Sequence, residues 1–143
     1  MKLANVASAF RQHLLAWPDR PASIVWDGGR TDRPTTDSPL TRWVRESLLP
    51  SASNPSTIGP TPLIRTEGVY LLDLYSPASD GRGPLAEWAD QLMAHFCVRT
   101  ELLYSGTSVT LLSTSQLGKS KAEPGWIAVS VTINWRSDTT NPL

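Results

Sequence analysis

Cysteine is almost missing from this chain, because Cys97 is its only example in 143 residues. A single thiol cannot form an internal disulfide, so the fold has to be stabilised by an apolar core. Apolar stretches long enough to cross a membrane are missing as well. The N-terminal apolar stretch is broken by Asn5, Ser8 and Arg11, whereas a secretory signal peptide needs about 7–15 unbroken apolar residues. The sequence therefore predicts a soluble protein that stays in a cytoplasm or joins a particle assembled there.

Net charge is missing too, because 13 basic residues balance 13 acidic ones. Proteins that bind nucleic acid carry a basic surface, and this composition has no excess of basic residues that could form one. A neutral chain has little charge repulsion to keep its copies apart, so the composition favours a homo-oligomer. The length is that of one ordinary domain, residues 1–143, and folding should bury about 68–70% of the unfolded surface.

Motifs for catalysis and cofactor binding are also missing. The chain has no G-x-S-x-G sequence and no glycine-rich turn between a strand and a helix. The tripeptide Gly118-Lys119-Ser120 resembles the end of a phosphate-binding loop, but that motif needs glycine where Ser113 stands. The motif also needs a helix immediately afterwards, and Pro124 would break one. We therefore predict an exposed loop at this place and no cofactor.

Residues that bind metals or act as nucleophiles are scattered along the chain. His95 and Cys97 lie two positions apart, and such residues on a helix point to nearly opposite sides. Cys97 is better explained as a small buried residue at the end of a helix. His13 lies on another helix, far in sequence from any cluster of metal ligands. The sequence predicts no catalytic residue and no metal site.

Asp73 is an acidic residue inside an otherwise apolar strand. A buried carboxylate needs a partner, which Arg65 or Arg136 on a flanking strand could supply. A structural ion pair, or a place at the edge of the sheet, is favoured over a catalytic role. A deep cleft that holds all three residues would instead indicate an enzyme or a ligand-binding domain.

Tryptophan, by contrast, is abundant, with six residues. Trp17 and Trp88 fit the apolar faces of two helices. The other four fall on or beside expected strands, and they belong either to the core or to an exposed interface, where aromatic residues are enriched: Trp26, Trp43, Trp126 and Trp135.

The clearest structural unit runs from Leu63 to Cys97. It predicts a long strand that ends at Pro77, a turn, and a helix with Pro84 at its first position. One face of the strand carries Val69, Leu71, Asp73 and Tyr75, and the other carries Tyr70, Leu72 and Leu74. A strand that is apolar on both sides belongs near the middle of a sheet. The helix has one apolar stripe, formed by Leu85, Trp88, Ala89, Leu92 and Phe96.

The remaining pattern adds a helix and several strands. We expect a helix at residues 2–17, strands at 22–26, 43–50, 108–115 and 127–135, and a short strand or turn at 100–104. Residues 43–50 also fit a short helix. In the last strand Ile127, Val129, Val131, Ile133 and Trp135 should face inward, and Ala128, Ser130, Thr132 and Asn134 outward.

Polar, proline-rich or glycine-rich stretches predict flexible loops at about 29–39, 50–62 and 116–125, and a disordered tail at 137–143. The fold class that follows is α+β. It is a single domain with a mixed or antiparallel sheet of about four to five strands and two helices packed on one face.

Three segments and the helix between them, in this order and spacing, resemble the tail terminator (tail-completion) proteins of tailed bacteriophages. The resemblance covers about residues 40–137. The segments are Trp43–Pro50, Gly68–Pro77 and Gly125–Ile133, and the helix contains Leu85–Asp90.

This resemblance implies a structural virion protein and no enzyme. Such proteins form a hexameric ring at the head-proximal end of the tail, stop the polymerisation of the tail tube and offer a surface to the head–tail connector. The implied partners are further copies of the chain, the tail-tube protein and the connector protein, with DNA passing through the ring without sequence recognition. The implied location is the virion tail, after assembly in the cytoplasm of a bacterial host.

Two other functions remain open at this point. A head–tail connector or a tail-tube protein of the same particle has a similar size and a mixed α/β fold, so fold alone does not separate it from a terminator. A small enzyme or ligand-binding domain outside any virus would need a polar cluster in a pocket, which the sequence does not show.

Overall fold

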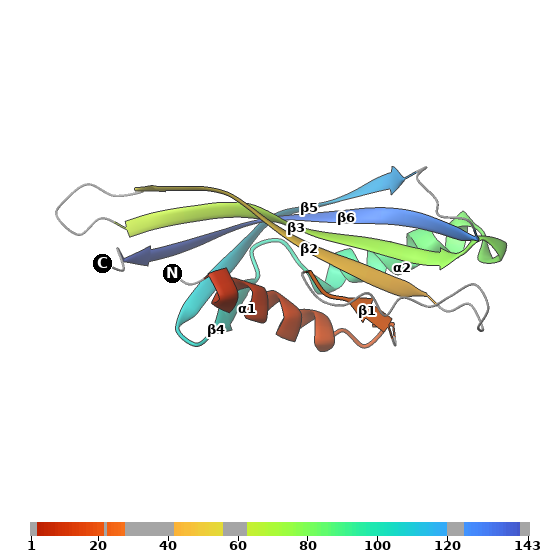
Figure 1. Ribbon diagram of the computed structural model, residues 1–143, viewed down its shortest axis with the longest axis horizontal. Coiled ribbons are helices and arrows are strands. Elements are labelled where there is room, and N and C mark those ends of the chain that lie inside the picture. Colours follow the sequence, from red (N-terminus) through yellow and green to blue (C-terminus); the bar gives the residue numbers. More distant parts are fainter. Residues whose placement is uncertain (1–2, 22, 28–41, 56–62, 120–124, 141–143) are drawn as a thin grey trace.

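The computed structural model describes residues 3–21, 23–27, 42–55, 63–119 and 125–140. These form two helices, one short 3-10 helix and a six-stranded sheet (Figure 1). The helices are α1 (Leu3–Leu15) and α2 (Arg82–His95), and the 3-10 helix is η1 (Ala78–Asp80). The strands are β1 (Ser23–Val25), β2 (Trp43–Pro55), β3 (Leu63–Pro77), β4 (Glu101–Tyr104), β5 (Thr107–Lys119) and β6 (Trp126–Thr140).

The sheet is mixed, with the strand order β1-β2-β3-β6-β5-β4. Strand β1 runs parallel to β2, and every other neighbouring pair is antiparallel. The expected α+β class is therefore confirmed, but the expected count of four to five strands is wrong. The sequence analysis predicted either a short strand or a turn at residues 100–104. The structure has an edge strand, β4, in this segment, because the tight turn at Ser105 and Gly106 folds β4 back onto β5.

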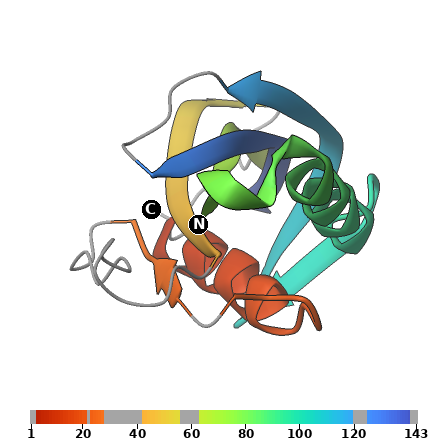
Figure 2. The same ribbon diagram turned by 90° about the vertical axis from the view of Figure 1, so that its right-hand side faces the viewer.

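Both helices pack into one core on the concave side of the sheet, which curves toward them in Figure 2. The sheet contributes alternate residues of β3, which lie opposite alternate residues of β6: Tyr70 opposite Ile133, Leu72 opposite Val131 and Leu74 opposite Val129. Side chains of one parity share one face of a sheet, so these three rows form a continuous apolar floor. The long central strand is confirmed, and so is the inward face of β6 from Val129 to Trp135.

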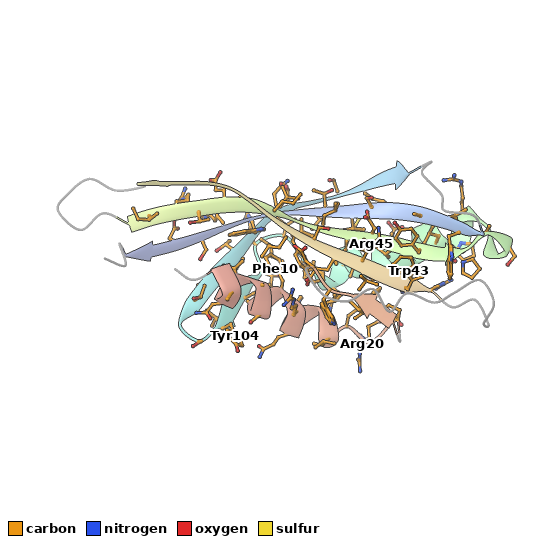
Figure 3. The ribbon with its side chains drawn as sticks, in the orientation of Figure 1. Phe10, Arg20, Trp43, Arg45 and Tyr104 are labelled. Carbon is orange, nitrogen blue, oxygen red and sulfur yellow. The ribbon has the colours of Figure 1, made fainter. Side chains whose placement is uncertain are left out.

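Phe10 of α1 is the centre of this core. Its ring stacks on Tyr70 of β3 at a centroid distance of 4.2 Å and lies 6.3 Å from Phe96 at the end of α2. In Figure 3 the Phe10 side chain points from α1 toward the sheet. The helix α2 begins at Arg82 rather than at Pro84, and it buries Leu85, Trp88, Ala89 and Leu92, as its apolar stripe predicted.

The opposite face of the sheet carries a second apolar cluster near the start of β2. It contains Val25, Trp43, Tyr75, Trp126 and Ala128, all buried. Trp43 and Tyr75 stack at 4.1 Å between centroids, and the guanidinium of Arg45 lies 5.3 Å from the Trp43 ring centroid. The outward face predicted for β6 is therefore not exposed here, because Ala128 and Ser130 are 0% and 4% accessible.

Three predicted irregular segments are partly strand. Residues 50–55 belong to β2, residues 116–119 to β5 and residues 137–140 to β6. Each is paired in register with a neighbour, for example Asn54 with Arg65 and Lys119 with Ala128. The backbone ladder supplies hydrogen bonds that do not depend on apolar side chains, so a polar composition did not reveal these strands. Residues 29–39 and the remaining parts of the predicted loops and tail lie outside the described residues, except Gly125, which is a turn residue.

Gly68 lies where β2, β3 and β6 approach each other too closely for a Cβ atom. A Cβ atom at this position would lie 2.7 Å from the Leu49 carbonyl oxygen and 2.7 Å from Cζ2 of Trp135. We expect Gly68→Ala to lower the free energy of unfolding by about 1–3 kcal/mol, as overpacking does elsewhere. Gly83→Ala is the matched control, because no atom lies within 4 Å there and the change should stabilise by about 0.4–1 kcal/mol. Denaturant titration of both variants would test this, and equal midpoints would contradict the packing argument.

Candidate functional site

The structure does not support the resemblance of Gly118-Lys119-Ser120 to a phosphate-binding loop. Gly118 and Lys119 lie in β5 and pair with Val129 and Ala128 of β6. A phosphate-binding loop needs free backbone N–H groups at the start of a helix, which a strand does not offer. The prediction of an exposed loop was also wrong for these two residues, while Ser120 lies outside the described part of the chain.

The three residues considered around Asp73 are not brought together. Asp73 is 6% accessible, and its Oδ1 accepts a hydrogen bond of 2.5 Å from the Ser130 hydroxyl. Arg65 instead forms an ion pair with Asp138, with 3.0 Å between Nε and Oδ1, and Arg136 lies opposite Glu67. The proposed pairing with Arg65 is wrong because eight residues of one extended strand separate the two side chains by about 26 Å.

The two histidines, which appeared unrelated in the sequence, lie against each other. The rings of His13 and His95 stack with 4.0 Å between centroids and an angle of 14°. His13 Nε2 lies 2.7 Å from the His95 carbonyl oxygen, and His95 Nε2 lies 2.5 Å from the His13 carbonyl oxygen. Each imidazole therefore hydrogen-bonds the C-terminal end of the other helix. Cys97 takes no part, and it is exposed rather than buried as predicted.

The lowered pKa of His13 predicts that the stability of the fold depends on pH. Burial, and then the neighbouring His95, lower the pKa of His13 from its usual value of 6.5, although the hydrogen bond to the His95 carbonyl opposes this. Below pH 6.5 the unfolded chain therefore binds more protons than the folded one. The free energy of unfolding falls as the pH drops from there through the native pKa of His13.

We expect the denaturant midpoint to be lower at about pH 5.5 than at about pH 7.5, in the range where histidine titrates and most carboxylates do not. Urea titrations at both values would measure it. In His13→Gln the difference should shrink, because glutamine keeps a donor for the His95 carbonyl but does not titrate. An unchanged difference in that variant would assign the pH dependence to other groups.

A buried polar network joins α1 to β2, and the sequence analysis missed it. Glu46 is 2% accessible on the core side of β2. Its Oε1 accepts hydrogen bonds from Arg11 Nη2 at 2.9 Å and from the Asp27 backbone N–H at 3.1 Å. Its Oε2 accepts a short hydrogen bond from the Tyr70 hydroxyl. The only indication in the sequence was the position of Glu46 in the strand. Side chains alternate between the two faces, so Glu46 shares the inward face with Val44 and Leu48.

The directions of the pKa shifts in this network indicate a structural role. Burial, and then the charge of Glu46, raise the pKa of the Tyr70 hydroxyl well above its usual value. The hydrogen bond to Glu46 likewise raises the pKa of Arg11. Tyr70 therefore stays protonated and Arg11 stays charged at any physiological pH, and neither group is set up to transfer a proton.

A surface hollow lies beside the histidine pair, not beside the Glu46 network. It has a volume of about 280 Å³ between α1 and β4, it is open to solvent, and its lining includes His13 and Glu101. The Glu101 carboxylate accepts a short hydrogen bond from Ser108. Pockets for small ligands usually enclose 70–90% of their ligand, which an open hollow does not do. Within the described residues, no group of three histidine, cysteine or acidic side chains could hold a metal ion.

The tryptophans belong largely to the interior. Five of the six are at most 3% accessible, and Trp26 packs against the core while partly exposed. Trp17 and Trp88 stack at 5.5 Å, and the Trp88 indole donates to the Asp19 carbonyl oxygen at 3.0 Å. Of the two interpretations of these residues, the core therefore accounts for most of them, and the large apolar residues classed as exposed in the described part of the chain are aliphatic.

The model of one known family, the phage tail terminator proteins, matches the chain over residues 5–135. This match spans both helices and nearly the whole sheet. The chain belongs to the phage tail terminator family. The resemblance found in the sequence is thereby confirmed, and it gives the chain a structural role in a phage tail, as part of the virion. The family is a structural one rather than a family of enzymes.

A comparison with solved structures shows that this family member shares its fold with another protein. One solved structure, of a protein without a functional name, has a TM-score of 0.67 and 18% sequence identity, and the alignment covers 100% of this chain and 99% of the other. At this identity the likeness shows a shared fold alone. No curated protein matches the chain. Among the residues that the structure describes, no helix is long and apolar enough to span a membrane.

Proposed function

We propose that this protein forms a closed ring on the head-proximal end of the phage tail. The ring ends polymerisation of the tail tube and presents the attachment surface for the head connector. The observation that carries the proposal is the family match over residues 5–135. Its partners are further copies of the chain, most simply five to make a hexamer, together with the tail-tube protein and the connector.

The structure is compatible with this role in two respects. Its buried polar groups, Glu46 with Arg11 and Tyr70, join elements of the fold and do not converge on a ligand pocket. Its sheet is long, and β2, β3 and β6 extend beyond the helices at one end (Figure 1). A ring needs two different surfaces on each subunit, one for each neighbour, and a sheet with two dissimilar edges offers them.

Two alternatives make different predictions for assembly. A tail-tube protein would stack without limit, and a connector would bind the portal side without stopping tube growth. A terminator ends its own assembly at a closed ring and also stops the polymerisation of the tail tube. The enzyme alternative is weakened because Asp73, Arg65 and Arg136 do not share a cleft.

The test is a capping assay with purified tail-tube protein that polymerises in vitro. We expect added terminator to shorten the tubes in proportion to its concentration and to appear in electron micrographs as one ring at one end. Glu87→Ala, an exposed change on α2, should cap as the parent does. Tubes of unchanged length, or continuous fibres of the protein itself, would contradict the proposal.

A further inference from the structure

Each outer edge of the sheet is covered over only part of its length. Strand β1 pairs with β2 at Trp43–Arg45, and β4 pairs with β5 at Thr107–Thr110. Arg99 and Thr100 extend the second pairing to Leu111 through backbone hydrogen bonds. Beyond these points, no strand in the described part of the chain pairs with the outer edge of β2 at residues 49–55 or of β5 at residues 113–119.

The two open edges lie at opposite ends of the sheet. The register places Pro50 level with Gly68, Trp135 and Leu111, and Trp43 level with Tyr75, Ala128 and Lys119. The open part of β2 therefore lies at one end of the sheet and the open part of β5 at the other, as Figure 1 shows. Within the described part of the chain, two stretches of outer edge are therefore without a strand partner, one at each end of the sheet and on opposite sides.

These edges carry little of the charge that usually discourages strand pairing. Exposed edges are commonly protected by charges, by prolines or by being very short. Residues 49–55 carry no charge, although Pro50 and Pro55 bound the part that can donate hydrogen bonds, and residues 113–119 carry only Lys119. Each open stretch also begins beside an exposed apolar residue, since Leu49 is 53% and Leu112 is 38% accessible. Leu112 sits at a register shift of β5. Open edges that carry few charges are sites to which another strand adds.

We infer that these two edges pair with each other between neighbouring copies of the chain, which rests on the proposed ring. The outer edge of β5 at residues 113–119 joins the outer edge of β2 at residues 49–55 of the next copy. Strands β2 and β5 point in opposite directions within one sheet, so a rotated copy brings them together antiparallel. Because the two edges differ, the contact is heterologous and repeats around a ring.

The short edge strands β1 and β4 select the register of this pairing. They block a level arrangement and leave a staggered one, with residues 52 and 53 opposite 115 and 114, because residues that lie directly opposite each other share one face of the sheet. Pro50 and Pro55 lack a backbone N–H, so the hydrogen bonds centre on residues 51–54. The stagger is about four residues, or about 14 Å, over four strands spaced about 4.8 Å apart. That corresponds to a strand tilt of about 35°, at the lower end of the usual range of a closed sheet.

The test is cysteine cross-linking between chains. Cys97 is exposed, so every variant carries Cys97→Ser, and single cysteines are added as Ala52→Cys in β2 or Ser115→Cys in β5, two positions on the same face of the sheet. A short bis-maleimide is applied to each variant alone and to an equal mixture, both as concentrated protein and with tail tubes present. We expect at least roughly tenfold more cross-linked dimer in the mixture than in either variant alone, because pairing raises the effective concentration of the two thiols.

Thr110→Cys is the matched control, because it lies on β5 where β4 covers the edge, opposite Glu101. Mixed with Ala52→Cys, it should give no more product than the single variants. The double variant with Ala52→Cys and Ser115→Cys should give a ladder that stops at the number of copies in the ring. Thermal unfolding midpoints equal to the parent's would show that each variant is folded.

Three outcomes would overturn the edge pairing: cross-linking by Ser115→Cys alone, equal product with Thr110→Cys, or no product in either sample. The first indicates a two-fold β5–β5 contact. The capping assay remains a separate test of the proposed function. A protein that caps tubes without this cross-link would keep its role as a terminator and lose the inferred interface.

Discussion

Phe10→Ala is expected to lower the free energy of unfolding by about 3–5 kcal/mol, as large-to-small changes of buried aromatic residues do. Phe10 is 0% accessible, and its ring stacks on Tyr70 at 4.2 Å. It also lies 6.1 Å from Trp135 and 6.3 Å from Phe96, between centroids. Its removal opens a cavity where α1, α2 and the sheet meet. Since a domain is stable by only about 5–15 kcal/mol, this is a large part of the total.

The control for Phe10→Ala is Leu15→Ala, at the last residue of the same helix. Leu15 is 48% accessible, so its loss should change the free energy of unfolding by no more than about 0.5 kcal/mol. Urea titrations followed by tryptophan fluorescence would measure both variants. Similar losses in the two variants would show that helix formation, rather than packing around Phe10, limits stability.

Glu46→Ala is expected to lower the free energy of unfolding by about 2–4 kcal/mol, because it leaves buried donors without an acceptor. The Tyr70 hydroxyl and the Asp27 backbone N–H both lose their carboxylate partner. The Arg11 side chain is 37% accessible, so water can hydrate it and its loss costs less. The greater part of the effect therefore comes from the buried hydroxyl and the amide.

Arg11→Ala and Glu87→Ala separate the parts of this network. Arg11→Ala should cost less than Glu46→Ala, since Glu46 keeps the hydroxyl and the amide as donors. Glu87 is an exposed glutamate on α2, and its replacement should stay within about 0.5 kcal/mol of the parent. Thermal and urea unfolding of the three variants would rank them. A cost for Arg11→Ala equal to that of Glu46→Ala would locate the main stabilisation in the ion pair.

The periodic pattern of apolar residues was sufficient for the elements that face the core. The spacing from Leu85 to Phe96 predicted the buried side of α2, and the alternation from Val129 to Trp135 predicted the inward face of β6. Such patterns record which side of an element is buried, and burial on one side is a local property of the sequence. The order of the segments also carried the family resemblance.

The same kind of pattern could not report the outer parts of the sheet. Strands β2 and β6 extend past the helices at one end (Figure 1), and the composition of residues 51–55 and 137–140 is polar. They are strands because β3 offers a ladder of backbone hydrogen bonds on both of its sides. Backbone groups are the same in every residue, which is why composition alone suggested loops and a tail.

The sequence by itself determined the fold class, the two helices, the central strand and the family. Only the tertiary structure decided which residues far apart in the chain meet. It joined His13 to His95 and Glu46 to Tyr70, and it separated Asp73 from Arg65. It also decided which stretches of β2 and β5 have open edges, because an edge exists only once the strand order is set. The periodicity of apolar residues, and with it the buried side of an element, can be recognised within one segment of the sequence. The contacts between distant residues and the open edges of the sheet depend on how the whole chain packs.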